Sequence, residues 1–283
     1  MTRRRELERH RHSLAEIREI MNSMKTLAYM ETRKLDRFLD AQHAVVQSIE
    51  NVVADLLSFH LETLPEAKVT MPVYLLIGTE RGFCGDFNHT LLQHLESSLQ
   101  ANPADKPALI VAGRKLYALL EEDERVVAWF DGASVAEEVT SLLNQIVSEL
   151  TGLQDKHGVL TVYCLYHADE AGIVMQRILP PFQELRHKPP RYAYPPVLNL
   201  PPRELLAELV DHYLFATLHE MLYTSLMVEN HKRVMHLDGA VKHLDDESTE
   251  MARRANILRQ EEIVEEIEVI LLSAASLGER PDK

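Results

Sequence analysis

The segment that most resembles a catalytic or ligand-binding site is glycine-rich. It covers residues 78–88, with the sequence Gly-Thr-Glu-Arg-Gly-Phe-Cys-Gly-Asp-Phe-Asn. It follows a short apolar run and precedes a helical pattern, which is where dinucleotide-binding domains place their phosphate loop. Its glycine spacing, G-x-x-x-G-x-x-G, differs from the G-x-G-x-x-G of that loop, and no Gly-Lys-Ser/Thr follows to hold a nucleotide with Mg²⁺. A tight strand-to-helix turn explains the glycines, and nucleotide binding stays the alternative.

Other side chains that could do chemistry are scattered along the chain. Cys84 could act as a nucleophile, but no adjacent residues mark a base or an oxyanion site. Cys84 and Cys164 are far apart in sequence, so a disulfide framework is not indicated and the cytoplasm is the expected compartment. The chain has 14 histidines, yet only His10 and His12 form a close pair and no HExxH or CxxC motif occurs. We therefore expect no metal and no cofactor.

A long helix is predicted over about residues 5–62, ending before Leu64-Pro65, where proline prevents easy continuation. Only Glu31 and Gln42 interrupt its stripe of apolar residues. A stagger of three and four residues held over such a length is typical of a coiled coil. The stripe consists of Leu14, Ile17, Met21, Met24, Ala28, Leu35, Phe38, Val45, Ile49, Val52, Leu56 and Phe59.

A second long helix is predicted from about residue 203 to residue 277, and its stripe makes it the expected antiparallel partner of the first. It is about fifteen residues longer than the first helix, so its end should extend past its partner by roughly 20 Å or more. Residues 269–277 of that end are apolar on every side, and a helix of this kind has to be surrounded. The sequence therefore predicts an apolar tip that enters a socket made by other chains. The stripe consists of Leu209, Tyr213, Leu237, Val241, Leu244, Met251, Ala255, Leu258, Ile263, Ile267 and Ile270.

The middle of the chain alternates strand and helix patterns. Strands are predicted near residues 73–78, 107–113, 125–130, 159–165 and 173–179, and helices over 88–100, 114–122 and 134–150. Alternation predicts βαβ units and a mostly parallel, Rossmann-like sheet with helices on its faces. The fold class is thus α/β plus a long antiparallel coiled coil. The predicted domains are residues 1–64, 65–202 with a proline-rich connector at its end, and 203–283.

Charge excludes one class of function. The chain has 283 residues and a formal net charge of −14, which argues against a general nucleic-acid binder. No run approaches the roughly 18 to 20 apolar residues of a membrane span. Arginines cluster within residues 3–11, and acidic residues crowd 245–247 and 261–268. These clusters are either solvated helix faces or surfaces that attract charged partners.

Three blocks of the chain match the patterns of one known family, in the same order. Met-Lys-Thr-Leu-Ala at residues 24–28 resembles M-K-x-[VL]-A, and residues 80–88 are similar to D-R-G-L-C-G-G-F-N. Asn256, Arg259, Gln260, Ile263 and the small-residue tail at 274–277 match the C-terminal pattern N-x-x-R-Q-x-x-I. In addition, Glu229, Arg233 and Met235 resemble S-E-x-x-A-R-M. On these blocks the chain resembles the gamma subunit of F-type ATP synthases, the central rotor shaft.

The resemblance implies a shaft without chemistry of its own, which turns inside a ring of alpha and beta subunits. It implies further partners in the epsilon subunit and the membrane ring of c subunits, and a peripheral position on the cytoplasmic side of the cell membrane. Arg259 and Gln260 would contact a beta-subunit loop, and Met24 and Lys25 would lie near the beta levers. The tip would include Glu266, Ile267, Ile270, Leu271 and Leu277.

Departures from the family pattern indicate a divergent branch, for which the alternate N-type ATPases are a candidate. Asn22 and Glu31 stand where lysines are common, Thr79-Glu80 replaces Ser-Asp, and Asp86 replaces a glycine. Two alternatives to the shaft stay open from the residues themselves. One is a Rossmann-like nucleotide enzyme with helical arms, and the other is a coiled-coil adaptor unrelated to ATPases.

Overall fold

The structure is a computed structural model that describes residues 2–65, 71–101, 107–168, 172–187 and 191–278. It divides into two compact units, one of Met1–Leu27 with Val234–Lys283 and the other of Ala28–Arg233. The long helices α1 (Thr2–Leu57) and α5 (Pro202–Gly278) contribute residues to both units. Among the residues that the structure describes, none of the helices combines the length and the apolarity needed to cross a membrane.

The second unit contains a five-stranded sheet in the order β3-β2-β1-β4-β5. The first four strands in this order are parallel, and β5 pairs antiparallel with β4. The mostly parallel, Rossmann-like sheet predicted from the sequence is confirmed. The strands are β1 (Pro72–Ile77), β2 (Ala108–Ala112), β3 (Val126–Phe130), β4 (Thr161–Ala168) and β5 (Gly172–Leu179), and the helices between them are α2 (Phe87–Ala101), α3 (Arg114–Tyr117) and α4 (Ala136–His157).

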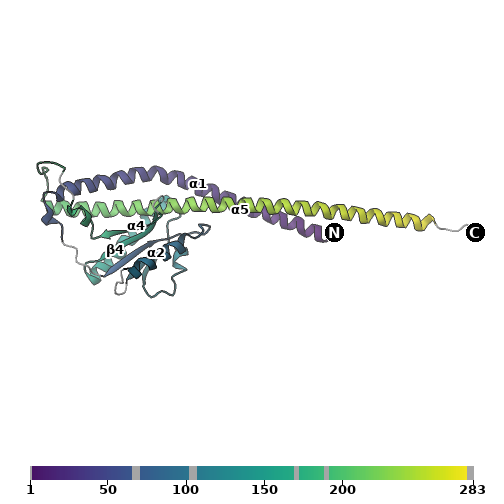
Figure 1. The fold of residues 1–283 in the computed structure, drawn as a ribbon, viewed down its shortest axis with the longest axis horizontal. Helices are drawn as coiled ribbons and strands as arrows, with labels where there is room; N and C mark the ends of the chain where they lie inside the picture. The colour runs from purple at the N-terminus through teal and green to yellow at the C-terminus, as the bar shows by residue number, and fades with distance from the viewer. Residues whose placement is uncertain (1, 66–70, 102–106, 169–171, 188–190, 279–283) are drawn as a thin grey trace, which may run out of the picture. The chain divides into compact units, whose positions relative to one another are not determined.

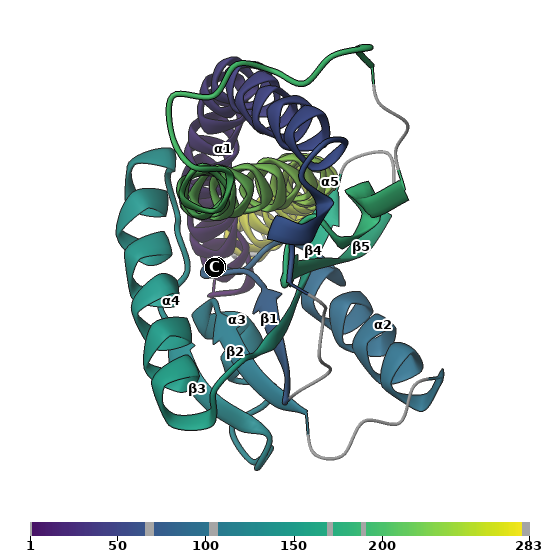
Figure 2. The same ribbon diagram turned by 90° about the vertical axis from the view of Figure 1, so that its left-hand side faces the viewer.

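Alternating side chains of the strands build two cores in the second unit. One core faces α4 and the parts of α1 and α5 that belong to this unit, and it includes Leu75, Ile110 and Leu222. The other core faces α2 and α3 and includes Leu76 and Leu91. Figure 2 shows α4 and α2 on opposite sides of the sheet, with α1 and α5 on the α4 side. The segment of α5 in this unit is therefore packed directly on the sheet.

Two predicted helices end earlier than the sequence indicates. Helix α1 stops at Leu57, where the Ser58 hydroxyl donates to the carbonyl of Ala54, and a 3-10 turn η1 (Leu61–Thr63) follows. The N–H of Phe59 then donates to the carbonyl of Leu56, three residues back, which marks the change from α-helical to turn bonding. Helix α3 stops at Tyr117, where the bonding changes to i→i−3 turns, with the N–H of Leu119 donating to Leu116 and that of Leu120 to Tyr117. Both corrections shorten an element without moving it. A second 3-10 helix, η2 (Gln183–His187), precedes the connector to α5.

The stripe predicted on α1 is wrong over part of its length in the second unit. Val45 and Val52 are about half exposed, whereas Val46 and Val53 are buried. Ala28 with Val46 and Leu35 with Val53 are each separated by five full turns at about 3.6 residues per turn. Val46 and Val53 therefore lie on the same side of α1 as Ala28 and Leu35, one position after the predicted Val45 and Val52. Phe38, and Ile17 in the first unit, are also more exposed than the stripe implies.

The polar residues that interrupt the stripe have partners in the second unit. Glu31 accepts a hydrogen bond from the backbone N–H of Ala136 at the start of α4, with 2.7 Å between the two atoms. Gln42 donates from Nε2 to the carbonyl of Ala216 on α5 at 2.9 Å. The two interruptions therefore fix neighbouring elements rather than weaken the packing.

In the first unit α1 and α5 run antiparallel, and ion pairs join them. Arg18 pairs with Asp245, and the Lys25 Nζ lies 3.1 Å from Asp238 Oδ1. The residue numbers rise on one helix as they fall on the other, which is the antiparallel coiled coil that the sequence predicts. Buried apolar residues of this unit are Leu14, Leu237, Val241 and Ala255.

Candidate functional site

The end of α5 in the first unit extends past the start of α1. Near that start, Arg4 Nε lies 3.5 Å from Glu262 Oε2, and α5 continues to Gly278. Figure 1 shows the N-terminal end of α1 beside α5 and the last part of α5 continuing beyond it. At about 1.5 Å per residue, residues 263–278 span roughly 24 Å. We call residues 263–278 the tip.

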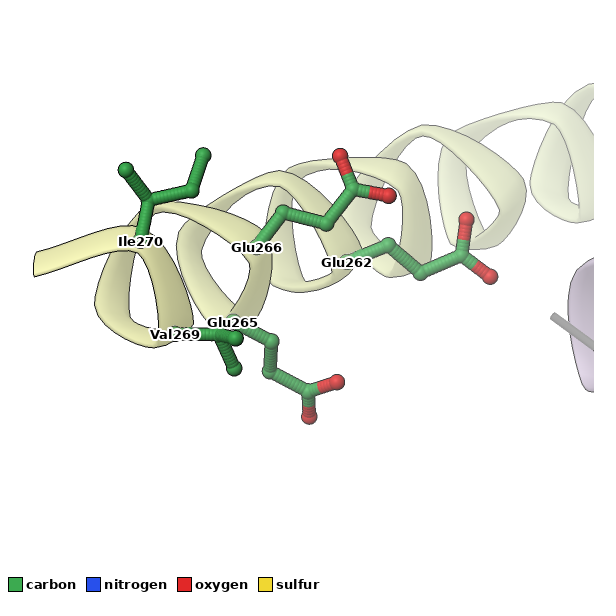
Figure 3. A pocket seen from close by; sticks show the side chains of 5 residues that line it. All are labelled: Glu262, Glu265, Glu266, Val269 and Ile270. Atoms are coloured by element: carbon green, nitrogen blue, oxygen red, sulfur yellow. The ribbon is translucent and has the colours of Figure 1, made fainter. Parts of the chain in front are cut away.

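The side chains of the tip that the structure describes are exposed all around the helix. Ile267 is 50% exposed, Ile270 and Leu271 are each 63% exposed, and Leu272 is 71% exposed. The described residues that line a shallow hollow at the base of the tip all belong to α5, and Figure 3 shows their side chains projecting in different directions from one helix. These lining residues are Glu262, Glu265, Glu266, Val269 and Ile270. Leu277 lies in the helix, but its side chain is outside the described side chains.

Exposed apolar side chains gathered on one helix end are typical of surfaces that bind another molecule. Burial of one such side chain stabilises an interface by about 1.5–3 kcal/mol. The tip also carries exposed carboxylates at its base, which keep that part of the helix hydrated. The arrangement suits contact with an apolar surface of another molecule. The exposed carboxylates of the tip are those of Glu265, Glu266 and Glu268.

Arg259 and Gln260 lie on α5 just before the tip, and both side chains are exposed. Ala255 and Leu258, on the other side of the same turns, face the pairing surface of the helix. The structure thus brings the predicted contacts Arg259 and Gln260 close to the tip residues along one helix. A planar guanidinium beside an amide at such a position suits hydrogen bonds to a partner's loop.

Met24 and Lys25 lie at a different level of the first unit. Lys25 pairs with Asp238, which is 21 residues before Arg259 on α5, roughly 32 Å along the helix. Asp238 is also bound by Lys242, so one carboxylate receives two ammonium groups. Met24 is half-buried. Lys25 is therefore already partly neutralised within the chain, unlike a cation offered freely to a partner.

The glycine-rich segment forms a loop at the carboxyl edge of the sheet, and the chain's own side chains fill it. Asn88 accepts a hydrogen bond from the Thr79 backbone N–H at 3.1 Å and donates to the Thr79 hydroxyl at 2.9 Å. A Cβ on Gly78 would lie 2.4 Å from the Cβ of Leu116, and Gly113 has a φ of 114°. The glycines at positions 78 and 113 thus serve the close approach of protein to protein where a nucleotide site would hold phosphate.

Cys84 lies in this loop and is a poor nucleophile. Its side chain is buried, and burial raises the pKa of the thiol to about 12, with the neighbouring Glu229 acting in the same direction. The Arg233 guanidinium opposes this shift without reversing it. The protonated thiol donates to the carbonyls of Arg81 and Gly82. A catalytic role for Cys84 is therefore not supported by its surroundings.

The buried pair of Glu229 and Arg233 is the feature that sequence reasoning missed. Both residues were matched to a family segment, yet their burial on α5 was not predicted. Arg233 is 5% exposed and Glu229 is 3% exposed, and the two side chains are bonded to each other. Burial raises the pKa of Glu229 above its ordinary range, while Arg233 lowers it. The sequence offered one signal of this burial. A glutamate and an arginine stand four residues apart, beside the apolar residues Val228 and Leu226.

Metal binding finds no support in the part of the chain that the structure describes. No group of three or more histidine, cysteine, aspartate or glutamate side chains there could hold a metal ion. His10 and His12, the close pair in the sequence, lie on α1, and both are exposed.

Comparisons with known proteins agree over nearly the whole chain. A family model described as ATP synthase matches residues 3–277. The ATP synthase gamma chain of Rickettsia typhi is 20% identical over 279 residues, covering 94% of this chain and 96% of the relative. The ATP synthase gamma chain of Desulfitobacterium hafniense is 22% identical over 289 residues, covering 98% and 100%.

Solved structures show the same fold. A chain of the Euglena gracilis mitochondrial ATP synthase rotor, in rotational state 1, aligns with a TM-score of 0.58 at 14% identity, covering 93% of this chain and 99% of that chain. A chain in the OSCP/F1/c-ring structure of the same enzyme aligns with a TM-score of 0.61 at 15% identity, covering 100% and 97%. The two long terminal helices around a central sheet are therefore a known arrangement.

Proposed function

The chain belongs to the ATP synthase family as its gamma-type central-stalk subunit, and we propose that it acts as a shaft whose apolar tip turns inside a sleeve of partner subunits. The shaft comprises residues 1–64 and 203–283, and the α/β domain with its connector comprises residues 65–202. Rotation couples ion movement through a membrane sector to ATP synthesis or hydrolysis on those partners. The chain itself does no chemistry.

The partners follow from this role. Alpha and beta subunits form the ring around the shaft, while the epsilon subunit and the membrane ring of c subunits bind the lower shaft and the α/β domain. The chain sits peripherally on the cytoplasmic side of the membrane. The transported ion is H⁺ or Na⁺, and it is selected in the membrane ring rather than by this chain.

The exposure of the tip is the observation that supports this proposal most strongly. A helix end that is apolar on all sides and exposed around its circumference requires an enclosing partner. Because the contacts of an apolar sleeve are non-directional, such a tip can turn without breaking specific bonds. Directional contacts then have to come from outside the tip, and Arg259 and Gln260 are placed to provide them.

Coupling requires that the shaft contact each conformation of the catalytic subunits with a different free energy. An asymmetric pair of helices meets this requirement because it presents a different face to each of the catalytic subunits around it. Arg259 and Gln260 are the contacts to a beta-subunit loop, with Met24 and Lys25 nearer the beta levers. Glu266, Ile267, Ile270, Leu271 and Leu277 belong to the tip.

The alternatives are less favoured by the geometry. A nucleotide enzyme would need an open carboxyl edge on the sheet, but Glu80, Asn88 and Leu116 fill this edge. A coiled-coil adaptor would explain the paired helices, yet it gives no reason for a tip that is apolar on every side.

Reconstitution with partner subunits from the same source tests the proposal. The alpha and beta subunits are purified with and without this chain, and ATP hydrolysis is measured on each preparation. We expect a stoichiometric complex whose steady ATP hydrolysis depends on the chain. A chain that stays alone in solution, with hydrolysis unchanged by its presence, would contradict the shaft and favour the adaptor.

A further inference from the structure

The loop of residues 79–88 is bonded to all of the parallel strands at their carboxyl ends. It continues directly from β1. The Glu80 carboxylate accepts hydrogen bonds from the backbone N–H of Arg114 after β2, at 3.0 Å, and of Gly132 after β3, at 2.8 Å. His167 near the end of β4 donates from Nε2 to the carbonyl of Phe87 at 2.9 Å. The loop thus connects the carboxyl ends of the four parallel strands to one another.

The same loop is bonded to α5 through Arg233. The guanidinium donates from Nε to the carbonyl of Gly82 at 3.2 Å and from Nη2 to Cys84 Sγ at 3.1 Å. The carbonyl of Arg81 lies 3.5 Å from Nη2, and the same nitrogen also binds Glu229. One buried side chain of the helix therefore reaches three residues of the loop, Arg81, Gly82 and Cys84.

A second contact lies one residue earlier on α5. The Lys232 ammonium is 3.3 Å from Asp86 Oδ1 and 5.6 Å from the centre of the Phe87 ring. That ring packs against the ring of His167, with 3.7 Å between their centres. Asp86 stands where the family pattern has glycine, so this chain adds an ion pair to the attachment.

Arg233 does more here than neutralise Glu229. Its Nη1 donates to Asn230 Oδ1 at 2.8 Å, while Nε donates to the loop and Nη2 is shared between the loop and Glu229. A guanidinium holds its donors in a fixed plane, so the bonds define both the axial position and the rotation of the helix against the loop. Apolar burial of α5 against the sheet is non-directional, so these hydrogen bonds add a directional part to the attachment.

We infer that Arg233 is a positioning residue which, with the loop of residues 79–88, fixes the α/β domain to α5 so that domain and shaft turn together. This inference rests on the proposed function, because only a shaft needs a junction that resists twisting. The carboxyl edge, where related sheets bind a ligand, serves here as the mount for the helix. Torque delivered to the α/β domain then reaches α5 without slip.

A double variant distinguishes two roles of Arg233, the attachment of α5 to the loop and the neutralisation of Glu229. Arg233→Met with Glu229→Leu removes both buried charges together, and apolar replacement of a buried pair is often neutral for stability. The readout uses the complete ATP synthase in inverted membrane vesicles. ATP-driven membrane potential is followed with a voltage-sensitive dye, which responds to either ion, and is divided by the rate of ATP hydrolysis. Arg125→Met is the matched control, because Arg125 pairs with Asp123 and Glu96 inside the α/β domain.

We expect the double variant to assemble and hydrolyse ATP like the wild type, while its ratio of potential to hydrolysis falls by about threefold or more. The Arg125→Met control should keep the wild-type ratio. Arg233→Lys keeps a charge beside Glu229 and loses the planar donors, so an intermediate ratio is expected even if the double variant does not assemble.

A wild-type ratio in the double variant, or in Arg233→Lys if only this variant assembles, would overturn the inference. An equal fall in the Arg125→Met control would overturn it as well, since loss of any ion pair in the domain would then suffice. Failure of the wild-type chain to assemble or to support hydrolysis would instead contradict the proposed function, so the two failures are distinguishable.

Discussion

Arg4 near the start of α1 and Glu262 on α5 form an ion pair, with 3.5 Å between Nε and Oε2, and this pair marks where the tip begins. Residues of α5 before it lie beside α1, and the residues after it are exposed. The pair thus divides α5 of the first unit into a segment that the chain itself partners and a segment left for another molecule.

Removal of the tip should weaken assembly. A chain ending at Glu268 lacks Val269, Ile270, Leu271 and Leu272, each more than 60% exposed in the chain alone. Because burial of one such side chain contributes about 1.5–3 kcal/mol, we expect binding to the alpha–beta ring to weaken by at least about tenfold. Titration of labelled chain into the ring measures this.

A chain ending at Gly278 is the matched control for the tip, since it loses only residues 279–283. It should bind like the full chain. Equal binding by the chains ending at Glu268 and at Gly278 would contradict the tip-in-sleeve account.

Arg259 should matter for turnover more than for folding. Its exposed side chain is placed to contact a partner, so Arg259→Gln should reduce ATP hydrolysis by the complex by about tenfold, equivalent to about 1.4 kcal/mol. The thermal unfolding of the isolated chain should not change. Arg253→Gln is the control, because Arg253 binds Glu250 on its own helix. Comparable losses of ATP hydrolysis in both variants would contradict a specific contact of Arg259 with a partner.

The isolated chain should not bind nucleotides. Glu80 accepts the N–H groups of Arg114 and Gly132, and Asn88 fills the turn after β1, so phosphate would meet a carboxylate where it needs donors. Calorimetric titration with ATP, ADP and NAD⁺ checks this expectation. Saturable binding abolished by a substitution in the loop would restore the nucleotide-enzyme alternative.

Both cysteines should be unreactive in the folded chain. Cys84 and Cys164 are buried, and burial raises the pKa of each thiol well above neutrality. The reactive thiolate is therefore scarce and shielded. Titration with a thiol reagent at pH 8 should label neither cysteine in the native chain and both after denaturation. Rapid labelling of native Cys84 would show that the loop opens.

His167 should make stability depend on pH. Burial lowers its pKa below the ordinary value of 6.5, and Lys232 acts in the same direction, while the hydrogen bond to Phe87 and the charge of Asp86 oppose the shift. As pH falls through 6.5, the unfolded chain takes up a proton at this residue that the folded chain resists, so the stability it contributes is present above 6.5 and lost below.

His167→Gln keeps an amide donor for the Phe87 carbonyl and removes the titration. The gap between wild-type and variant thermal midpoints should therefore shift against the wild type as pH is lowered from 7.5 to about 5.5. Parallel midpoints across this range would contradict the assigned pKa direction.

The sequence predicted the class of each element better than its contacts. Periodicity located both long helices, all five strands and the α/β arrangement, because apolar spacing reports directly on which face is buried. It misplaced part of the α1 stripe, since Val45 and Val46 are neighbours and only the helical period decides which of them faces inward. The apolar repeats of a coiled coil and of a straight helix, about 3.5 and 3.6 residues per turn, differ too little to be distinguished by reading the sequence.

The attachment of α5 to the sheet was not predictable from local pattern. Arg233 stands beside Lys232 and His231, so the sequence there looks like a solvated helix face. Its burial depends on the loop of residues 79–88, about 150 positions earlier in the chain. The apolar character of the tip, in contrast, was predictable because it depends only on the composition of one continuous segment.

Direct observation of rotation tests the central claim most directly. The alpha–beta ring is fixed to a surface, and a gold rod is attached to the α/β domain of this chain. With ATP present we predict one-way rotation of the rod, which stops when the chain ends at Glu268. A ring that hydrolyses ATP steadily with the chain bound while the rod shows only Brownian motion would contradict the account.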